Sequence, residues 1–168
     1  MKVEKGRTGG CGCGKVRYRI LREPIFINNC YCALCQLQSG GTSSVYAFYE
    51  IDAVEIISGK LKRFDQQTGT DRTQKVMQCA ECGIGLSFQP FPTGRHGIAV
   101  RLGSMDDPFD LVPDAAVWVS ERMPWVALPA NVPAFDAYYQ ASELLTPDRY
   151  ARLTALVEMH RQDKSLEV

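Results

Sequence analysis

The stretches CGCG at residues 11–14 and CAECG at residues 79–83 decide the fold that this sequence can adopt. In both, two cysteines stand close together and a glycine follows the second one. A Cys-x-x-Cys-Gly turn lets two thiolates converge on one metal ion, and its glycine adopts a backbone conformation that other residues resist. Each turn supplies two ligands, so the two stretches together predict one tetrahedral zinc site. Its ligands would be Cys11, Cys13, Cys79 and Cys82.

A zinc ion held by four thiolates has no position left for a substrate, so this site is expected to be structural. It would join the start of the domain to its middle. Two other interpretations of the first pair stay open. Cys11 and Cys13 could be small buried residues that bind nothing, or they could form a disulfide, although such close neighbours strain the preferred bridge geometry.

A third group of cysteines lies in NNCYCALCQLQSG, residues 28–40, and supplies three thiols without a fourth. The two histidines of the chain, His96 and His160, have no recognisable ligand spacing around them. Zinc with three protein ligands and one open position is typical of catalytic sites, and three thiolates favour sulfur as the fourth ligand. The group therefore predicts an open, labile catalytic zinc site. Its ligands would be Cys30, Cys32 and Cys35.

Two other uses of the three thiols compete with the open zinc site. An iron–sulfur cluster would need a fourth protein ligand or an unusual substitute. A thiol–disulfide role for Cys32 and Cys35 matches the Cys-x-x-Cys spacing, but no βαβ pattern surrounds these residues. The open zinc site is the interpretation that the residues favour.

Alternating apolar residues predict a mainly β, mostly antiparallel domain. Short segments rich in β-branched and aromatic residues are bounded by Gly, Pro, Asp or Asn, which is typical of strands that end in turns. These segments are residues 15–20, 24–28, 44–50, 53–58, 73–78, 85–89, 97–102 and 115–120.

The sequence TPDRYARLTALVEMHRQ, residues 146–162, predicts one C-terminal helix that begins with Thr146 as cap and Pro147 at the first position. It is expected to lie against the sheet or against a partner subunit, and a homodimer is compatible with this. Its predicted apolar face is Tyr150, Leu153, Val157 and His160. Residues 120–138, rich in proline and aromatic side chains, predict an irregular strap over the fold. We expect residues 1–138 to form the zinc-binding β domain and residues 139–168 a helical extension packed on it.

Composition narrows the partners. The chain has 168 residues and a formal net charge of zero, without a block of Lys and Arg. This argues against a surface for nucleic acid or for an anionic membrane, because both need clustered cations. The N-terminal ten residues are polar, and apolar runs are far shorter than a membrane span, so we expect a cytoplasmic protein that binds small molecules or proteins. In that reducing compartment, cysteines at tight spacings favour metal ligands over disulfides.

The three cysteine groups, in the order GGCGCGKVRYRI, CYCALCQLQSGG and CAECGIGLSF, resemble the glutathione-dependent formaldehyde-activating enzyme (GFA) family, which includes the centromere-protein-V-like proteins. GSMDDP at 103–108 and ERMPWVALPANVPAFD at 121–136 look like later landmarks of the same family. The resemblance covers about residues 9–137. The predicted C-terminal helix is outside this pattern.

The resemblance implies a fold of several small antiparallel sheets around a four-cysteine zinc site, often called a β-tent. It also implies that the four-cysteine site is structural and that Cys30, Cys32 and Cys35 form the thiol-binding catalytic site. The activity implied is that of a carbon–sulfur lyase, the reversible addition of glutathione to formaldehyde that gives S-hydroxymethylglutathione. Zinc binding would deprotonate the substrate thiol, and holding two reactants together would supply much of the rate.

The residues that would bind the thiol's carboxylates stay open. Candidate cations near the motifs are Lys15, Arg17, Arg72, Arg95 and Arg101, and each could equally be a solvated surface residue. The stretch after Cys35 is the neutral Gln36-Leu37-Gln38, so a thiol other than glutathione is compatible with it. Three function classes are retained: the lyase, a zinc-stabilised thiol carrier or protein-binding module that catalyses nothing, and a redox thiol protein.

Overall fold

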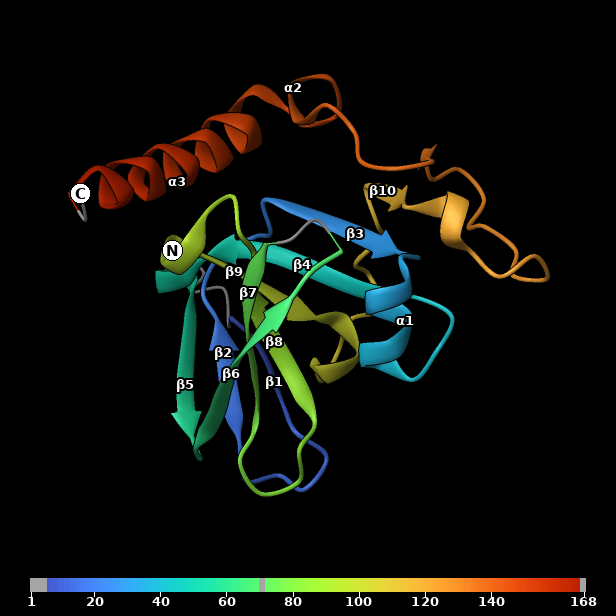
Figure 1. Ribbon diagram of the computed structural model, residues 1–168. Coiled ribbons are helices and arrows are strands. Elements are labelled where there is room, and N and C mark those ends of the chain that lie inside the picture. The colour runs from blue at the N-terminus through green and yellow to red at the C-terminus, as the bar shows by residue number, and fades with distance from the viewer. Residues whose placement is uncertain (1–5, 70–71, 167–168) are drawn as a thin grey trace.

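The computed structural model describes residues 6–69 and 72–166, whose strands form two sheets (Figure 1). The smaller, antiparallel sheet has the order β1-β2-β5 and consists of Arg7–Gly10, Arg17–Ile20 and Val54–Ser58. The larger sheet has the order β11-β10-β3-β4-β9-β8-β7-β6. Its strands, in chain order, are β3 (Phe26–Cys30), β4 (Ser44–Glu50), β6 (Leu61–Gln67), β7 (Thr73–Cys79), β8 (Gly85–Gln89), β9 (Gly97–Arg101), β10 (Ala115–Val117) and β11 (Ala134–Phe135).

Helices are few. The α-helices are α1 (Ala33–Ser39), α2 (Ala141–Leu144) and the long C-terminal α3 (Pro147–Leu166). Short 3-10 turns are η1 (Ile51–Ala53), η2 (Gly94–His96), η3 (Leu102–Ser104) and η4 (Val119–Glu121). The mainly β class with a C-terminal helix is thus confirmed. None of the described helices has the length and the apolar composition needed to cross a membrane.

Each of the eight predicted segments overlaps a strand, and the described part of the chain adds three more. The added strands are β1, β6 and the two-residue β11. Among the described strands, β6 lies at the edge of the larger sheet and pairs with β7. It is exposed along most of its length, and because neither face is buried its sequence lacks the apolar alternation of a strand with one buried face. β10 departs from the antiparallel pattern because it runs parallel to both β3 and β11.

The larger sheet is buried on both of its faces in the middle. Along β4, Ala47 and Tyr49 belong to the core between the two sheets, whereas Tyr46 and Phe48 belong to a second core on the opposite face. This division follows from the two-residue period of a strand, which sends neighbouring side chains to opposite faces. The second core is the one that the C-terminal segment covers, with Leu156 of α3 among its buried residues.

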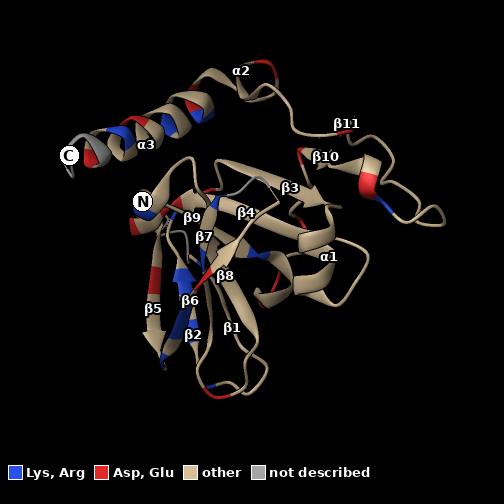
Figure 2. Ribbon diagram, viewed as in Figure 1, with Lys and Arg blue, Asp and Glu red and all other residues tan. Residues whose placement is uncertain are grey.

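Helix α3 lies across the larger sheet on the side of the second core (Figure 1). Both signs of charge alternate along it, as Figure 2 shows. Of the predicted face, Leu153, Val157 and His160 are half-buried on the packed side, while Tyr150 is 38% exposed and the buried Leu156 was not predicted. Leu153 still packs against the second core, so the predicted face is rotated, not reversed.

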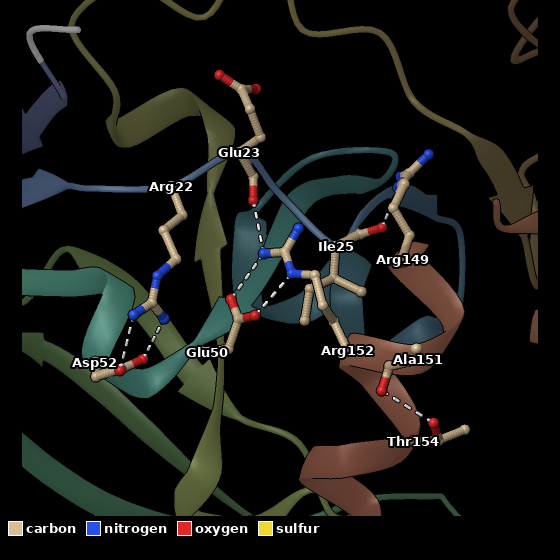
Figure 3. A network of polar contacts seen from close by, with 9 residues as sticks. All are labelled: Arg22, Glu23, Ile25, Glu50, Asp52, Arg149, Ala151, Arg152 and Thr154. Atoms are coloured by element: carbon tan, nitrogen blue, oxygen red, sulfur yellow. Dashed lines mark hydrogen bonds and ion pairs between the residues drawn. The ribbon is translucent and has the colours of Figure 1, made fainter. Parts of the chain in front are cut away.

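Two arginines attach α3 to the strands beneath it (Figure 3). Arg152 donates from Nε and Nη2 to the two carboxylate oxygens of Glu50, at 2.7 and 2.8 Å, and from Nη2 to the Glu23 carbonyl at 2.9 Å. Arg149 donates to the Ile25 carbonyl and to Asp114, the latter at 2.9 Å from Nη1. These contacts fix the helix over one end of the sheet.

Candidate metal centres

The first cysteine group brings the turn after β1 against the turn after β7. The sulfur atoms of Cys11, Cys13, Cys79 and Cys82 all lie within 4.8 Å of one another. Sulfurs at the corners of a tetrahedron around zinc, each at about 2.3 Å, would lie about 3.8 Å apart. The Cys13 and Cys79 sulfurs are 3.8 Å apart, and those of Cys11 and Cys13 are 3.3 Å apart. Four thiols in this arrangement fit one tetrahedral zinc ion.

The two turns are built alike. The N–H of Cys11 donates to the Val16 carbonyl at 3.1 Å, and the N–H of Cys79 donates to the Ile84 carbonyl at 3.0 Å. A glycine in the left-handed region follows the second cysteine of each turn, Gly14 with φ 74° and Gly83 with φ 75°. Other residues rarely adopt this conformation, so the glycines explain why the Cys-Gly order recurs in both stretches.

The backbone around this cluster favours thiolates. The N–H of Val16 donates to the Cys11 sulfur at 3.3 Å and, with the neighbouring thiols, lowers the pKa of Cys11 to about 6. The backbone N–H of Ile84 likewise lowers the pKa of Cys82. A backbone hydrogen bond from Lys15 acts to lower the pKa of Cys13, but the neighbouring thiols and burial outweigh it and raise that pKa to about 12. Cys11 and Cys82 thus ionise readily, whereas a bound cation would favour the thiolate form of Cys13, which is the form that binds metal.

The second cysteine group lies where β3 ends and α1 begins. Cys30 is the last residue of β3 and is buried, Cys32 caps α1, and Cys35 lies in the first turn of that helix. Their sulfurs also lie within 4.8 Å of one another. The N–H of Cys35 donates to the Cys32 sulfur at 3.4 Å. The end of β3, followed directly by the start of α1, therefore brings three thiols together. A tetrahedral metal ion held by these three sulfurs would keep its fourth position open to a ligand from outside the chain.

One negative charge is already favoured in this second cluster. Hydrogen bonds from Cys30 and Cys35, together with backbone N–H groups, lower the pKa of Cys32 to about 3. The pKa of Cys30 is raised because its thiol hydrogen-bonds to Cys32 and Cys35 and because it is buried. Cys30 acts to lower the pKa of Cys35, but Cys32 and burial outweigh it and raise that pKa to about 12. Further ionisation of the cluster thus needs a bound cation.

Of the five candidate cations, Arg101 of β9 is partly buried and lies near the three-cysteine cluster. Burial lowers the pKa of Arg101, and the nearby Cys35 opposes that shift. The guanidinium donates to Ser44 Oγ at 2.6 Å and to Gln38 Oε1 at 2.5 Å. Gln38 lies in α1 after the cysteines, so its hydrogen bond from Arg101 keeps the positively charged guanidinium next to this helix.

A cavity of about 630 Å³ opens beside the three-cysteine cluster, and all three cysteines line it. Phe26, Phe48, Phe88 and Trp118 contribute to its walls. Trp118 has φ 57° and ψ 39°, a left-handed conformation that bulky side chains seldom adopt and that costs on the order of 1–3 kcal/mol. The fold thus holds an indole at the cavity wall despite a strained backbone.

Tyrosines form a polar wall of the same cavity, and the buried Asn28 is hydrogen-bonded to two of their hydroxyls. The Asn28 side chain donates to the Tyr138 hydroxyl at 2.8 Å and accepts from the Tyr139 hydroxyl at 3.1 Å. Both tyrosines line the cavity together with Tyr46. Burial raises the pKa of Tyr46 and of Tyr138 well above 10, so both hydroxyls keep their protons near neutral pH.

The remaining candidate cations and the two histidines lie outside the two cysteine clusters. Arg17 pairs with Asp106, and Arg95 and His96 both pair with Asp163 of α3 at 2.8 and 2.7 Å. His160 packs edge-on against Phe91 and belongs to neither cysteine cluster. Arg72 lines the cavity and stacks over the Phe91 ring at 4.5 Å. Lys15 follows the first cluster in the β1–β2 turn, and its carbonyl accepts a hydrogen bond from Ser58 Oγ.

Sequence reasoning missed several residues of the site. Glu121 accepts from the N–H of Ala33 at the start of α1, Tyr138 belongs to the polar wall, and Asn28 donates to its hydroxyl. One signal was available, because two successive asparagines in a strand that ends at a cysteine are costly to bury without a role. Tyr138 and Glu121 carry no comparable local pattern.

The chain has relatives among known proteins. A family model described as glutathione-dependent formaldehyde-activating enzyme matches residues 6–121, more than half of the chain. No curated protein matches. Among solved structures, the crystal structure of a Rhodobacter sphaeroides protein is similar, with a TM-score of 0.48 and 20% sequence identity, over 76% of this chain and 98% of that one.

Proposed function

Because the chain belongs to the glutathione-dependent formaldehyde-activating enzyme family, we propose that it is a zinc-dependent carbon–sulfur lyase or synthase of the S-(hydroxymethyl)glutathione synthase type. It would form and break the adduct between a small thiol, such as glutathione, and formaldehyde or a similar electrophile in the cytoplasm. The observation that supports this most is the contrast between the clusters. The three-cysteine cluster lines a cavity of about 630 Å³, whereas none of the four other cysteines does.

Cys30, Cys32 and Cys35 would hold the catalytic zinc. When bound there, zinc would supply a Lewis-acidic position at which a substrate thiol binds as its thiolate. Arg101 places a fixed positive charge near this group of thiolates and would offset part of the charge that a fourth sulfur adds.

The polar wall is positioned to serve the carbonyl oxygen of the electrophile. Tyr138 and Tyr46 are protonated near neutral pH and so can donate hydrogen bonds inside the cavity. The side chain of Asn28 fixes the Tyr138 hydroxyl. The aromatic rings beside them lower the local polarity, which strengthens such hydrogen bonds.

Cys11, Cys13, Cys79 and Cys82 would hold a second, structural zinc. They form a closed set of four, and two of them, Cys11 and Cys79, are buried. In this proposal residues 1–138 are the zinc-binding β domain and residues 139–168 are an extension that covers its second core.

Metal analysis combined with thiol titration tests the proposal. The purified full chain should hold two zinc ions, and millimolar glutathione should perturb only the ion at the three-cysteine site. Cobalt substitution makes this visible, because thiolate-to-cobalt charge-transfer bands change when a sulfur ligand is added. Two-dimensional exchange NMR with formaldehyde and glutathione should then show adduct exchange that is faster than in buffer. A single metal that is indifferent to thiol would contradict the proposal.

A further inference from the structure

The cavity beside the three-cysteine cluster is far larger and more apolar than a one-carbon aldehyde requires. Its volume of about 630 Å³ falls within the range of roughly 300–1,000 Å³ that is usual for pockets that take drug-sized ligands. Aromatic rings of Phe26, Phe48, Phe88 and Trp118 line it next to the cysteines. Formaldehyde has two heavy atoms and would leave most of this apolar wall in contact with water.

The chain's C-terminal segment builds a large part of that wall. The family match ends at residue 121, and five lining residues lie beyond it: Tyr138, Tyr139, Ala141, Leu153 and Val157. The last two come from α3, which Arg152 attaches to Glu50 and to the Glu23 carbonyl. Leu153 and Val157 thus form an apolar roof over the cavity that the three cysteines line, and the ion pairs of α3 hold this roof in place.

Charged groups at the cavity are few. Apart from the cysteines, only Arg72 and Glu121 are charged among the lining residues in the described part of the chain. Glu121 already accepts from the N–H of Ala33, and Arg72 stacks on Phe91. Glutathione carries two carboxylates, so Arg72 can pair with one of them and the other must face solvent. The inner apolar wall is left for the part of the adduct that comes from the aldehyde.

We propose that the electrophile handled at this site is an aldehyde that bears an apolar ring or an alkyl chain of several carbons. This inference rests on the proposed function. In the reaction, the thiol sulfur forms a bond to the carbonyl carbon, and the C=O π pair moves onto the oxygen. The oxygen gains the proton that the thiol lost, so atoms and electrons balance without an oxidant or reductant. The substituent of the aldehyde lies against the roof of Leu153 and Val157.

Affinity for the adduct should therefore grow with the apolar size of the aldehyde-derived group. Each buried methylene group should strengthen binding by about fourfold, provided that it reaches the apolar wall. The probes are S-methyl-, S-butyl- and S-benzylglutathione, stable thioethers that share one peptide body and differ only in the group attached to sulfur.

Calorimetry with the zinc-loaded full chain is the test. The Kd should fall at least tenfold from S-methyl- to S-benzylglutathione, and Leu153→Ser or Val157→Ser should reduce this ratio to below about threefold. Ala141→Phe, which fills the cavity without removing a packed side chain, should also reduce the ratio. Met159→Ser on the exposed side of α3 is the matched control and should leave the ratio unchanged. A Kd that does not vary along the series would overturn the inference.

Two further arms separate this inference from the proposed function. If the Kd does not vary with size while the chain still accelerates exchange of the formaldehyde–glutathione adduct, the inference fails and the proposed function stands. If the Kd falls with size but neither formaldehyde nor benzaldehyde forms an adduct faster than in buffer, the apolar site stands and the proposed reaction fails. In a third outcome, benzyl mercaptan binds tightly while the Kd is the same for all three S-substituted glutathiones. This result would show that the apolar group belongs to the thiol substrate and would overturn the inference.

Discussion

Arg101 is the residue whose position says most about the charge of the three-cysteine site. Three thiolates and a further substrate sulfur around a divalent ion carry a net negative charge, which is costly beside apolar walls. A partly buried guanidinium near Cys35, hydrogen-bonded to Ser44 and Gln38, lowers that cost. Sequence alone could not separate Arg101 from the four other candidate cations, because burial depends on how β9 meets β4 and α1.

Replacing Arg101 should weaken zinc binding at one site only. We expect Arg101→Met to lower the zinc affinity of the three-cysteine site by about tenfold or more, as is usual when a supporting group near metal ligands is lost. The affinity of the four-cysteine site should not change. Competition with a chromophoric chelator measures both affinities. Arg19→Met, which removes an exposed cation paired with Glu55, is the control, and an equal loss at both sites would contradict this role.

At the scale of elements, strands were easier to predict than their pairing. The alternating pattern of residues 44–50 reappears as β4, with Ala47 and Tyr49 on one face and Phe48 on the other. The parallel addition of β10 beside β3 joins residues more than 80 positions apart, and no local pattern records it. Helix α1 was not predicted, because its N-cap is Cys32, which is not one of the usual capping residues.

The same limit explains which parts of the candidate site could be predicted from the sequence. The four-cysteine cluster follows from two turns of fixed geometry, so short-range spacing was enough to predict it. The cavity beside the other cluster depends on contacts such as Asn28 with Tyr138, which are 110 residues apart. Such contacts arise from the way α3 and the preceding strap fold back over the second core.

Helix α3 should be held more weakly at low pH. Burial by itself would raise the pKa of Glu50, but the hydrogen bonds from Arg152 and the backbone, together with the charges of Arg152 and Arg22, outweigh burial and the pKa is lowered. A carboxyl whose folded-state pKa lies below its unfolded value of about 4.3 stabilises the fold fully above that value. The stabilisation is lost as pH falls through the folded-state pKa.

Arg152→Met should therefore lower the free energy of unfolding by about 1–2 kcal/mol at pH 7, a value already reduced for partial solvent screening. The difference from the unsubstituted chain should start to shrink as pH falls below the unfolded-state pKa of about 4.3. It should vanish below the lowered folded-state pKa, where Glu50 is protonated in both states. Urea unfolding at several pH values measures it. Arg161→Met removes an exposed pair with Glu158 on the same helix and should change stability by less than about 0.5 kcal/mol. Equal effects of the two variants would contradict a specific anchor.

At the scale of the whole molecule, the four-cysteine cluster joins the two sheets. Cys11 and Cys13 belong to the turn between β1 and β2 of the smaller sheet, whereas Cys79 and Cys82 belong to the end of β7 and the turn before β8 of the larger one. A metal ion at that point would fix the sheets against each other around the shared core. The three-cysteine cluster lies at the end of one strand and joins no second sheet.

Loss of one ligand should therefore have unequal effects at the two clusters. Cys82→Ser should release the structural zinc and lower the free energy of unfolding by more than about 4 kcal/mol, a loss expected when a metal that closes a fold is removed. Cys32→Ser should cost less than about 2 kcal/mol, because the second cluster only orders the start of α1. Denaturant unfolding followed by circular dichroism, with zinc release recorded in the same samples, compares the two.

Both side chains are changed in the same way, so each variant is the control for the other. Equal destabilisation would show that both zinc ions hold the fold and would favour a protein-binding module over an enzyme, since a site that must open to a substrate sulfur cannot also be a required clamp.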